Sequence, residues 1–396
     1  MLFSWRKLLA FSGPGLLMSI AMVDPGNIES SLQAGAVSGY QLLWVLWWTT
    51  IIALLFQVLS TRISLVNGRH LAQVCRVMYA PGTKYALWVM MEIAIIASDV
   101  QEVIGSAIAI NFLSNNQIPL WAGALITAVD TFTFLLLEQA GLRKLEALFA
   151  VLIATMSISF GYMYVAGHPD NSAAIEGIIA FDCDRKSVLP AVGIVGAVIM
   201  PHNLYLHSAL LVSRRVNRAK AVEIREANKY SAIDSTISLL LSYVINVFIV
   251  GAFAEAFYNN PDFDSDNIDL ISSGEYLTQK YGSAMKYIWA IGLLAAGQSS
   301  TMTGTYAGQF VMEGFLSLKI KPWKRVAITR SFAMIPTLLV ALFASHRILN
   351  DLNEWMNILQ SFQLPFALVP VIHFSSIPGI MGRFALSRLS QVICWL

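Results

Sequence analysis

Asp24-Pro25-Gly26-Asn27 and Met200-Pro201-His202-Asn203 are the two stretches that decide the fold of this chain. Each interrupts a long apolar segment with a proline, and each places an asparagine three residues after a side chain that can bind a metal. The second motif begins 176 residues after the first (24 to 200), close to half of the 396-residue chain. This spacing predicts an internal repeat, with one interrupted helix in each half and one site between them.

The composition indicates a membrane protein. Hydrophobic residues make up 56% of the chain and charged residues only 13%, whereas soluble proteins carry about 25% charged residues. Stretches of about 20 mainly apolar residues, each long enough to cross a hydrocarbon core of roughly 30 Å, recur along the chain. The ten predicted spans are residues 8–36, 41–66, 85–113, 118–137, 144–166, 188–212, 230–258, 284–316, 325–345 and 355–376.

The Lys and Arg residues fall mainly on one side of the membrane in this topology. Of the 26 such residues, those assigned to the other side or to a span are Arg185, Lys186, Lys280, Lys286, Arg347 and Arg330. By the positive-inside rule, this asymmetry predicts that both termini are cytoplasmic. We therefore expect one polytopic domain over residues 1–396, with repeats at about 8–166 and 188–376. A plasma membrane and an endosomal, lysosomal or vacuolar membrane both fit this topology.

The two prolines leave backbone oxygen atoms without helical partners. Pro25 lacks an N–H group, so the carbonyl of Ala21, four residues back, loses its hydrogen bond, and Pro201 does the same to Ala197. Within a bilayer such carbonyls must face protein, water or an ion. Asp24 adds a carboxylate in the middle of a span, which is costly and by default functional. These features predict an ion site between the two breaks.

The candidate ligands are mostly hard oxygen atoms with one soft sulfur. They are the Asp24 carboxylate, the Asn27 amide oxygen, the Ala197 carbonyl and the Met200 thioether, with the Ala21 carbonyl as a further oxygen. Oxygen ligands alone suit Mg²⁺ or Ca²⁺, whereas a thioether is useful only to softer transition ions. The set therefore favours Mn²⁺ or Fe²⁺. The alternative is that both prolines only kink packed helices and that Met200 fills the core.

Ionisable side chains elsewhere in the spans indicate a route for protons. Asp99 and Glu102 are three residues apart, which places both on one face of a helix, where two buried carboxylates tend to take up protons. His202 and His207 can titrate near physiological pH. Arg330 is an intramembrane arginine, for which Asp99 or Glu102 is the expected partner. The structural alternative is that these groups are hydrogen-bonded or paired only to lock helices together.

Four stretches of the chain match a known family. They are Gly13-Pro14-Gly15, Asp24 through Ser30, Ala197 through Ser208, and Gly297 through Gln309. On these residues the chain resembles the NRAMP (natural resistance-associated macrophage protein) family of proton-coupled divalent metal transporters, in its eukaryotic branch. The resemblance implies an all-α integral membrane protein with a LeuT-like core of two inverted five-helix repeats, in which helices 1 and 6 are broken. Family members usually carry eleven or twelve spans, compared with the ten predicted here.

The resemblance also implies which residues act. The metal is held at the family positions that match Asp24, Asn27, Ala197 and Met200, and Gln360 lends its amide oxygen during part of the cycle. Asp24 would also link the metal to a proton route, with two further acids as carriers and an arginine as their electrostatic partner. That route comprises Asp24, Asp99, Glu102, His202, His207 and Arg330.

The function predicted from these observations is secondary active transport of Mn²⁺ or Fe²⁺ toward the cytoplasm, coupled to protons. No cofactor and no enzymatic reaction are expected, and the partners are divalent metal ions, protons and the lipid bilayer, with no nucleic acid. Two alternatives stay close: a relative that transports Mg²⁺ or Al³⁺, and an uncoupled divalent metal uniporter.

Two more distant classes fit the sequence less well. An intramembrane zinc enzyme would use His202 and His207, but these are five residues apart with no Glu between them, whereas helical zinc pairs use an interval of four beside a Glu. A sodium-coupled amino-acid carrier would bind a substrate carboxylate at the helix breaks, and Asp24 would repel that carboxylate.

Overall fold

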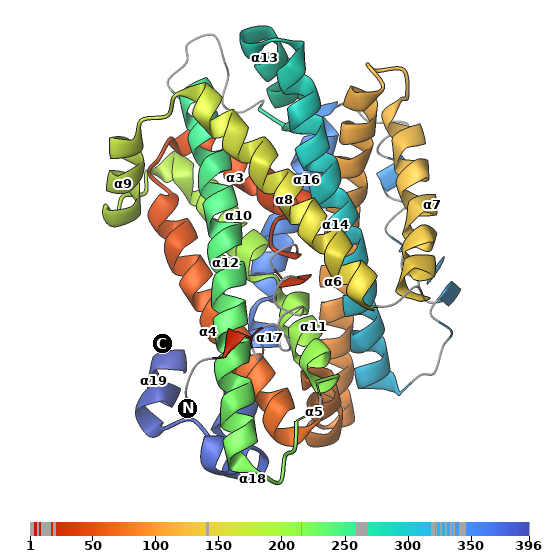
Figure 1. Ribbon diagram of the computed structural model, residues 1–396, viewed down its shortest axis with the longest axis vertical. Helices are drawn as coiled ribbons and strands as arrows, with labels where there is room; N and C mark the ends of the chain where they lie inside the picture. Colours follow the sequence, from red (N-terminus) through yellow and green to blue (C-terminus); the bar gives the residue numbers. More distant parts are fainter. Residues whose placement is uncertain are drawn as a thin grey trace.

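The computed structural model describes residues 21–139, 142–214, 216–258, 268–317 and 346–395, together with isolated positions outside these ranges. Every regular element in this part of the chain is a helix (Figure 1). Within it, six helical segments are long and apolar enough to cross a membrane. They are Leu43–Asn67, Pro81–Leu113, Ala147–Gly167, Arg185–Val212, Ala221–Phe257 and Asp351–Ser376.

Most predicted spans coincide with observed helices. The first appears as α3 (Pro25–Ser38), which covers only its second half, and the ninth, 325–345, lies mostly outside the described residues. The others are α4 (Leu43–Asn67), α6 (Pro81–Leu113), α7 (Leu120–Gln139), α8 (Leu142–Gly167), α10 (Val188–Ile199) with α11 (Pro201–Val212), α12 (Ala221–Phe257), α14 (Ser283–Leu316), and α16 (His346–Gln363) with α17 (Pro365–Ser376). The two-repeat boundaries themselves stay a prediction.

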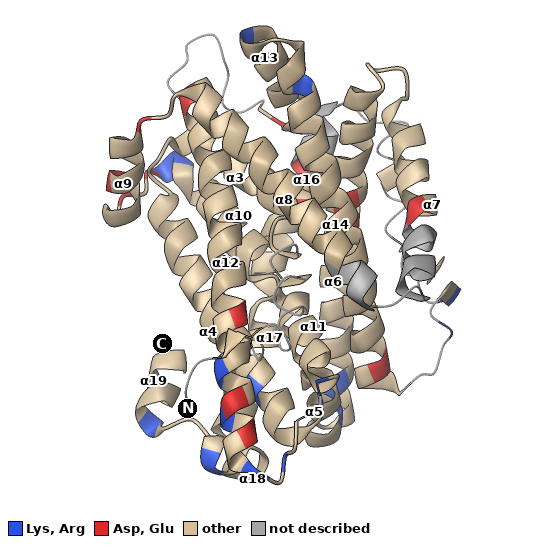
Figure 2. Cartoon of the chain, viewed as in Figure 1, with Lys and Arg blue, Asp and Glu red and all other residues tan. Residues whose placement is uncertain are grey.

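Short helices that the hydropathy pattern does not reveal lie at the two ends of the bundle. Figure 1 shows α9 and α13 at one end, and α5, α18, α19 and both marked chain ends at the other. Their bounds are Leu71–Met78 for α5, Asn171–Ile179 for α9, Leu270–Tyr281 for α13, Pro378–Met381 for α18 and Arg388–Trp395 for α19, with 3-10 turns at Arg185–Ser187 (η1) and Gly382–Phe384 (η3). Lys and Arg gather at the end that holds the termini, in the pattern expected for a cytoplasmic face (Figure 2).

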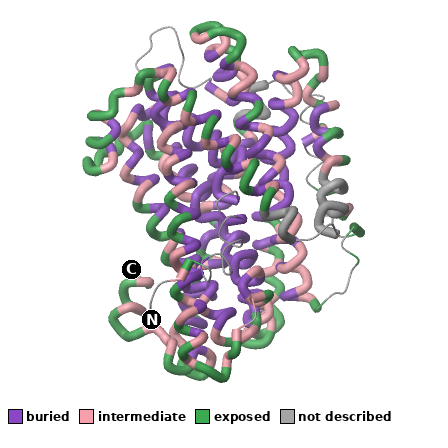
Figure 3. The backbone as a smooth tube through the Cα atoms, in the orientation of Figure 1, coloured by how far each residue is buried: buried purple, intermediate pink, exposed green. Residues whose placement is uncertain are grey.

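The exterior of the bundle is apolar. Buried residues fill its interior (Figure 3), yet large apolar side chains also lie outside, such as Val129, Ile158 and Val165, which are 67%, 72% and 69% exposed. A soluble protein rarely exposes apolar surface this widely. The surface therefore fits contact with lipid chains.

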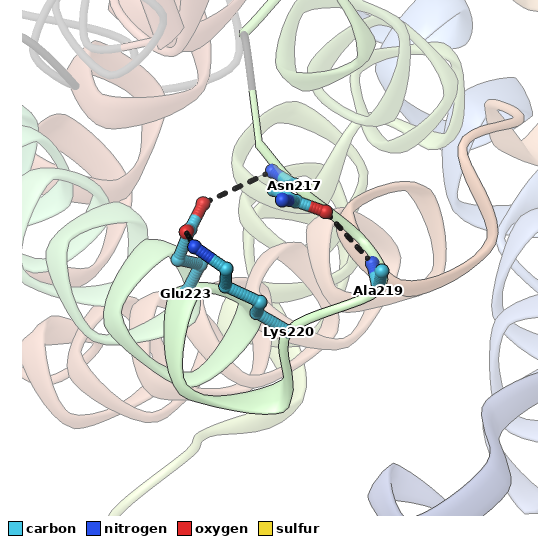
Figure 4. Close-up of polar contacts among 4 residues, drawn as sticks. All are labelled: Asn217, Ala219, Lys220 and Glu223. Carbon is cyan, nitrogen blue, oxygen red and sulfur yellow. Dashed lines mark hydrogen bonds and ion pairs between the residues drawn. The ribbon is translucent and has the colours of Figure 1, made fainter.

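The start of α12 is fixed by a compact polar turn (Figure 4). The Asn217 side-chain oxygen accepts a hydrogen bond from the Ala219 N–H at 3.1 Å, and the Asn217 N–H donates to the Glu223 carboxylate at 3.3 Å. The Lys220 ammonium lies 3.2 Å from the same carboxylate. Since both partners of this pair are exposed, it contributes little to stability. The turn fixes where the connection from α11 ends and α12 begins.

Candidate metal centre

The first proline break is a capped helix start. Helix α3 begins at Pro25, where a missing N–H costs nothing. Asp24 precedes it with extended backbone (φ −91°, ψ 170°), and its Oδ1 accepts a hydrogen bond from the Asn27 N–H at 2.7 Å. Asp is among the best residues for this capping position. The carboxylate is therefore held at the helix N-terminus by one oxygen.

The second break is built differently. Helix α10 ends at Ile199 and α11 begins at Pro201, which leaves Met200 between them. Met200 has φ 34° and ψ 102°, in a region that non-glycine residues rarely adopt. Such strained backbone persists only where the surroundings enforce it, and it is common at functional sites. The structure thus confirms both predicted breaks.

Asparagine side chains satisfy the carbonyls that the prolines leave free. The Asn27 Nδ2 donates to the Ala197 carbonyl at 2.9 Å and to the Met22 carbonyl at 2.7 Å. The Asn203 Nδ2 donates to the Ala21 carbonyl at 3.4 Å. A carbonyl oxygen has two lone pairs, so the Ala197 oxygen keeps one for a second partner.

The four predicted metal ligands are buried around these contacts. Asp24, Asn27, Ala197 and Met200 are each at most 1% exposed. Hydrogen bonds join Asp24 to Asn27 and Asn27 to Ala197, and the Met200 sulfur lies 3.2 Å from the Asn203 Nδ2. Within the described residues, no group of three or more His, Cys, Asp or Glu side chains forms a metal cluster. A metal here would meet one carboxylate, amide and carbonyl oxygens and a thioether.

Several buried oxygen atoms near the breaks accept no hydrogen bond from the part of the chain that the structure describes. They are Asp24 Oδ2, Gln57 Oε1, Asn203 Oδ1 and Gln360 Oε1. In the three amides the N–H groups already donate to neighbours: Asn203 to the Ala21 carbonyl at 3.4 Å, Gln57 to the Met22 sulfur at 3.6 Å, and Gln360 to Gln101 at 3.0 Å. Buried acceptors without donors are costly, and a cation satisfies them.

An amide chain connects the first break to α6 and α16. The Gly26 carbonyl accepts from the Asn357 Nδ2 at 3.0 Å, and the Asn357 Oδ1 accepts from the Gln101 Nε2 at 2.9 Å. The Gln101 Oε1 in turn accepts from Gln360. Gln360, which the sequence suggests as an occasional ligand, is therefore linked to the break through two other amides.

The two predicted proton carriers lie close together on α6. A Cβ atom added at Gly304 of α14 would lie 3.0 Å from Asp99 Oδ1 and 3.1 Å from Glu102 Oε1. Both carboxylates thus lie against the same glycine of α14, and on one face of α6 as their spacing predicts. One turn further along α6, a Cβ at Gly105 would lie 2.4 Å from Pro25, so this helix packs directly on the first break. Arg330, their predicted partner, lies outside the described residues.

The two histidines of α11 are buried. His202 is 2% exposed and His207 is fully buried. Among the residues described, both ring nitrogens of His207 and the Nδ1 of His202 lack a hydrogen-bond partner. The assignment of His202 and His207 to the proton route stays a prediction.

Sequence reasoning missed two polar residues at the site. Gln57 is an isolated amide in an apolar span, and nothing in its spacing distinguishes it. Asn203 occupies the position in the second motif that Asn27 occupies in the first, so the repeat itself was a signal for it. Its partners, the Ala21 carbonyl and the Met200 sulfur, become visible only in three dimensions.

Comparison with known proteins agrees with this geometry. Residues 15–396 match the family model described as natural resistance-associated macrophage protein-like. The chain is 54% identical to metal transporter Nramp3 of Arabidopsis thaliana, over 100% of this chain and 78% of the relative. It is 54% identical to natural resistance-associated macrophage protein 2 of Mus musculus, over 97% of this chain and 72% of the relative.

Solved structures show the same architecture. The Eremococcus coleocola manganese transporter, in complex with an aromatic bis-isothiourea substituted compound, superposes with a TM-score of 0.89 at 31% identity, over 99% of this chain and 84% of that one. The inward-facing conformation of Mhp1 superposes with a TM-score of 0.60 at 15% identity, over 91% of this chain and 76% of that one, which shows a common fold only. The LeuT-like helical fold expected from the sequence is confirmed.

Proposed function

The chain belongs to the natural resistance-associated macrophage protein family of divalent metal transporters, and from that premise we propose that it carries Mn²⁺ or Fe²⁺ toward the cytoplasm together with protons. It is a membrane transporter and not an enzyme. The proposal needs no resident cofactor.

One observation carries the proposal: the Asp24 carboxylate is fully buried, and its Oδ2 accepts no hydrogen bond from the described residues. A buried charge is unfavourable unless it is paired or coordinates a metal. The amide oxygens of Asn203, Gln57 and Gln360 are also buried without a hydrogen-bond donor among the described residues. A divalent cation beside Asp24 would compensate this buried charge.

The Met200 thioether supports a transition metal over Mg²⁺ or Al³⁺. It is buried at the second break, where strained backbone holds the residue in place. Hard cations gain little from a thioether in place of water, whereas Mn²⁺ and Fe²⁺ tolerate a softer ligand. The name of the solved relative from Eremococcus coleocola, a manganese transporter, is in line with this choice.

Proton coupling rests on α6. Asp99 and Glu102 of this helix both lie against Gly304 of α14, and Gly105 of the same helix packs on Pro25. We assign Asp24 as the link between metal and proton, and Asp99 and Glu102 as carriers, with His202 and His207 on the inner half of the path and Arg330 as electrostatic partner. Two neighbouring buried carboxylates favour proton coupling over an uncoupled uniporter.

The proposed orientation in the membrane rests on the charge distribution. Lys and Arg gather at the end of the bundle that holds both termini (Figure 2), which supports cytoplasmic termini. A plasma membrane or an endosomal, lysosomal or vacuolar membrane would each present an acidic or proton-rich side opposite this face.

The test is transport by the purified protein in liposomes across an imposed pH gradient. We expect uptake of Mn²⁺, Fe²⁺ and Cd²⁺ but not of Mg²⁺ or Ca²⁺, with internal acidification during Mn²⁺ uptake. In the Asp99→Asn and Glu102→Gln variants, acidification should fall while Mn²⁺ still binds. Equal uptake of Mg²⁺ would favour the Mg²⁺-transporting alternative, and Mn²⁺ uptake without acidification of the lumen would establish a uniporter.

A further inference from the structure

The two asparagines of the proline motifs exchange hydrogen bonds between the repeats. Asn27 donates to the Ala197 carbonyl, which Pro201 leaves free, and Asn203 donates to the Ala21 carbonyl, which Pro25 leaves free. Each pair joins one repeat to the other, and the positions correspond under the 176-residue shift. Each broken helix therefore receives its missing donor from the opposite half of the chain.

The second contact of each asparagine breaks this symmetry. Asn27 also donates to a backbone oxygen, that of Met22, at 2.7 Å. Asn203 instead lies with its Nδ2 3.2 Å from the sulfur of Met200. A carbonyl oxygen can only accept, so the amide nitrogen of Asn203, and not its oxygen, must face the Ala21 carbonyl. The same nitrogen therefore faces the Met200 sulfur. The asymmetry places a donor on the one soft candidate ligand.

The Met200 side chain needs such an anchor. A methionine side chain has three rotatable bonds and adapts readily to its surroundings, so its sulfur is poorly fixed by packing alone. The backbone of Met200 is set by the break, at φ 34°. The amide of Asn203, itself 1% exposed and tied to Ala21, holds the other end of the side chain.

We propose that Asn203 is a positioning residue of the metal site, which acts through the Met200 sulfur and sets how strongly the site prefers soft over hard divalent ions. This inference rests on the proposed metal transport and goes beyond it, because Asn203 is not one of the four predicted ligands. Asn203 also ties the second repeat to the first through its hydrogen bond to Ala21. One amide therefore both positions the Met200 sulfur and joins the two repeats.

The experiment is a double-mutant cycle between Asn203 and Met200 with metal affinity as the readout. Isothermal titration of the purified full chain with Cd²⁺ alone and Ca²⁺ alone gives the ratio of their affinities. We expect Asn203→Ala to lower the Cd²⁺ to Ca²⁺ preference about fivefold, the size of one net hydrogen bond. In a Met200→Leu background, the same change should leave the ratio within about twofold.

Further variants separate positioning from packing. Asn203→Leu keeps the side-chain volume without a donor and should lower the ratio as Asn203→Ala does, whereas Asn203→Gln keeps a donor and should restore part of it. The matched control is Asn246→Ala, which removes a buried amide that accepts from Ser31 at 3.1 Å and touches no candidate ligand. The control should leave the ratio unchanged. If Asn203→Ala does not fold, Asn203→Leu carries the cycle.

Two results would overturn the proposal: an unchanged ratio in Asn203→Leu, or an equal fall of the ratio in the parent and Met200→Leu backgrounds. Neither result touches the proposed function, which fails instead if Cd²⁺ affinity is the same in the parent and in Asp24→Ala. Running Asp24→Ala in the same titrations therefore tells the two failures apart.

Discussion

The two proline breaks share a register but differ in backbone and chemistry. At the first, Asp24 has ordinary extended backbone and caps α3 with one carboxylate oxygen. At the second, Met200 has φ 34° and no side-chain cap. The repeat thus reproduces the proline and the asparagine but places a hard, charged candidate ligand at the first break and a soft, neutral one at the second. We infer that the first break supplies charge for any divalent ion and the second supplies selectivity.

Removal of the charge at the first break should have the largest effect. We expect Asp24→Asn to lower Mn²⁺ uptake about 100-fold or more, as for loss of one partner of a buried charge pair. Asn caps a helix as well as Asp does, so thermal stability in detergent should stay near that of the parent. The measurement is radioactive Mn²⁺ uptake into liposomes. Substantial residual uptake in this folded variant would remove Asp24 from the site.

The same isosteric change at two buried sulfurs sharpens the comparison. Met200→Leu should weaken Mn²⁺ or Cd²⁺ binding about tenfold and leave Ca²⁺ binding within about twofold, because only softer ions use a thioether. Met22→Leu is the matched control, since Met22 is equally buried and its sulfur also meets an amide, that of Gln57. Titration with each metal checks both. Equal changes in metal selectivity in the two variants would show that the Met200 sulfur does not determine selectivity.

A glycine next to each break tests how rigidly it is held. A Cβ at Gly196 would lie 2.1 Å from the backbone oxygen of Asn357, whereas the three atoms nearest to one at Gly26 all belong to the Gln101 side chain, the nearest at 2.6 Å. Backbone cannot move aside as a side chain can, so Gly196→Ala should destabilise the protein by about 1–3 kcal/mol, more than Gly26→Ala. Thermal unfolding in detergent measures both. A larger loss for Gly26→Ala would contradict this ranking.

The smallest effect is expected at an aspartate that caps a helix without any ligand role. Asp170 caps α9 outside the membrane, and hydrogen bonds from the Ser172 hydroxyl and from nearby N–H groups hold the pKa of its carboxyl below the usual range. A depressed pKa contributes stability above the unfolded value of 3.8, and this contribution is lost as the pH falls through the lower folded value.

Asp170→Asn should therefore leave Mn²⁺ uptake unchanged at neutral pH, in contrast to Asp24→Asn. Any difference from the parent in thermal stability should shrink as the pH approaches 3. Unfolding scans between about pH 3 and pH 7 check this. A large loss of uptake in Asp170→Asn would mean that loss of any helix-capping carboxylate charge lowers uptake, and that the effect at Asp24 is not specific to the metal site.

Much of the fold could be predicted because long apolar segments and prolines act locally. The span predicted at 85–113 ends where α6 ends, at Leu113, and both helix breaks fall at the predicted prolines. Short helices such as α5 and α13 were not predicted as elements, because they are amphipathic and too short for a hydropathy window.

The site could be predicted only as a set of residue types. The burial of Asp24 and Met200 follows from their place in apolar spans, but their assignment as metal ligands stays a prediction. Which amide nitrogen meets which carbonyl depends on contacts between residues more than 160 positions apart, as for Asn27 and Ala197. Gln57 gave no signal at all, since a single amide in an apolar span is as compatible with packing as with function.

The exchange of hydrogen bonds between the halves bears on how the protein is made. During synthesis the Ala21 carbonyl enters the bilayer long before Asn203, its partner, has left the ribosome. An unsatisfied carbonyl is unfavourable in hydrocarbon, so the first half must keep this group in water or against another segment until the second half inserts. The order of the repeats therefore matters for membrane insertion. The Ala21 carbonyl of the first half lacks its Asn203 donor until the sixth span has been inserted.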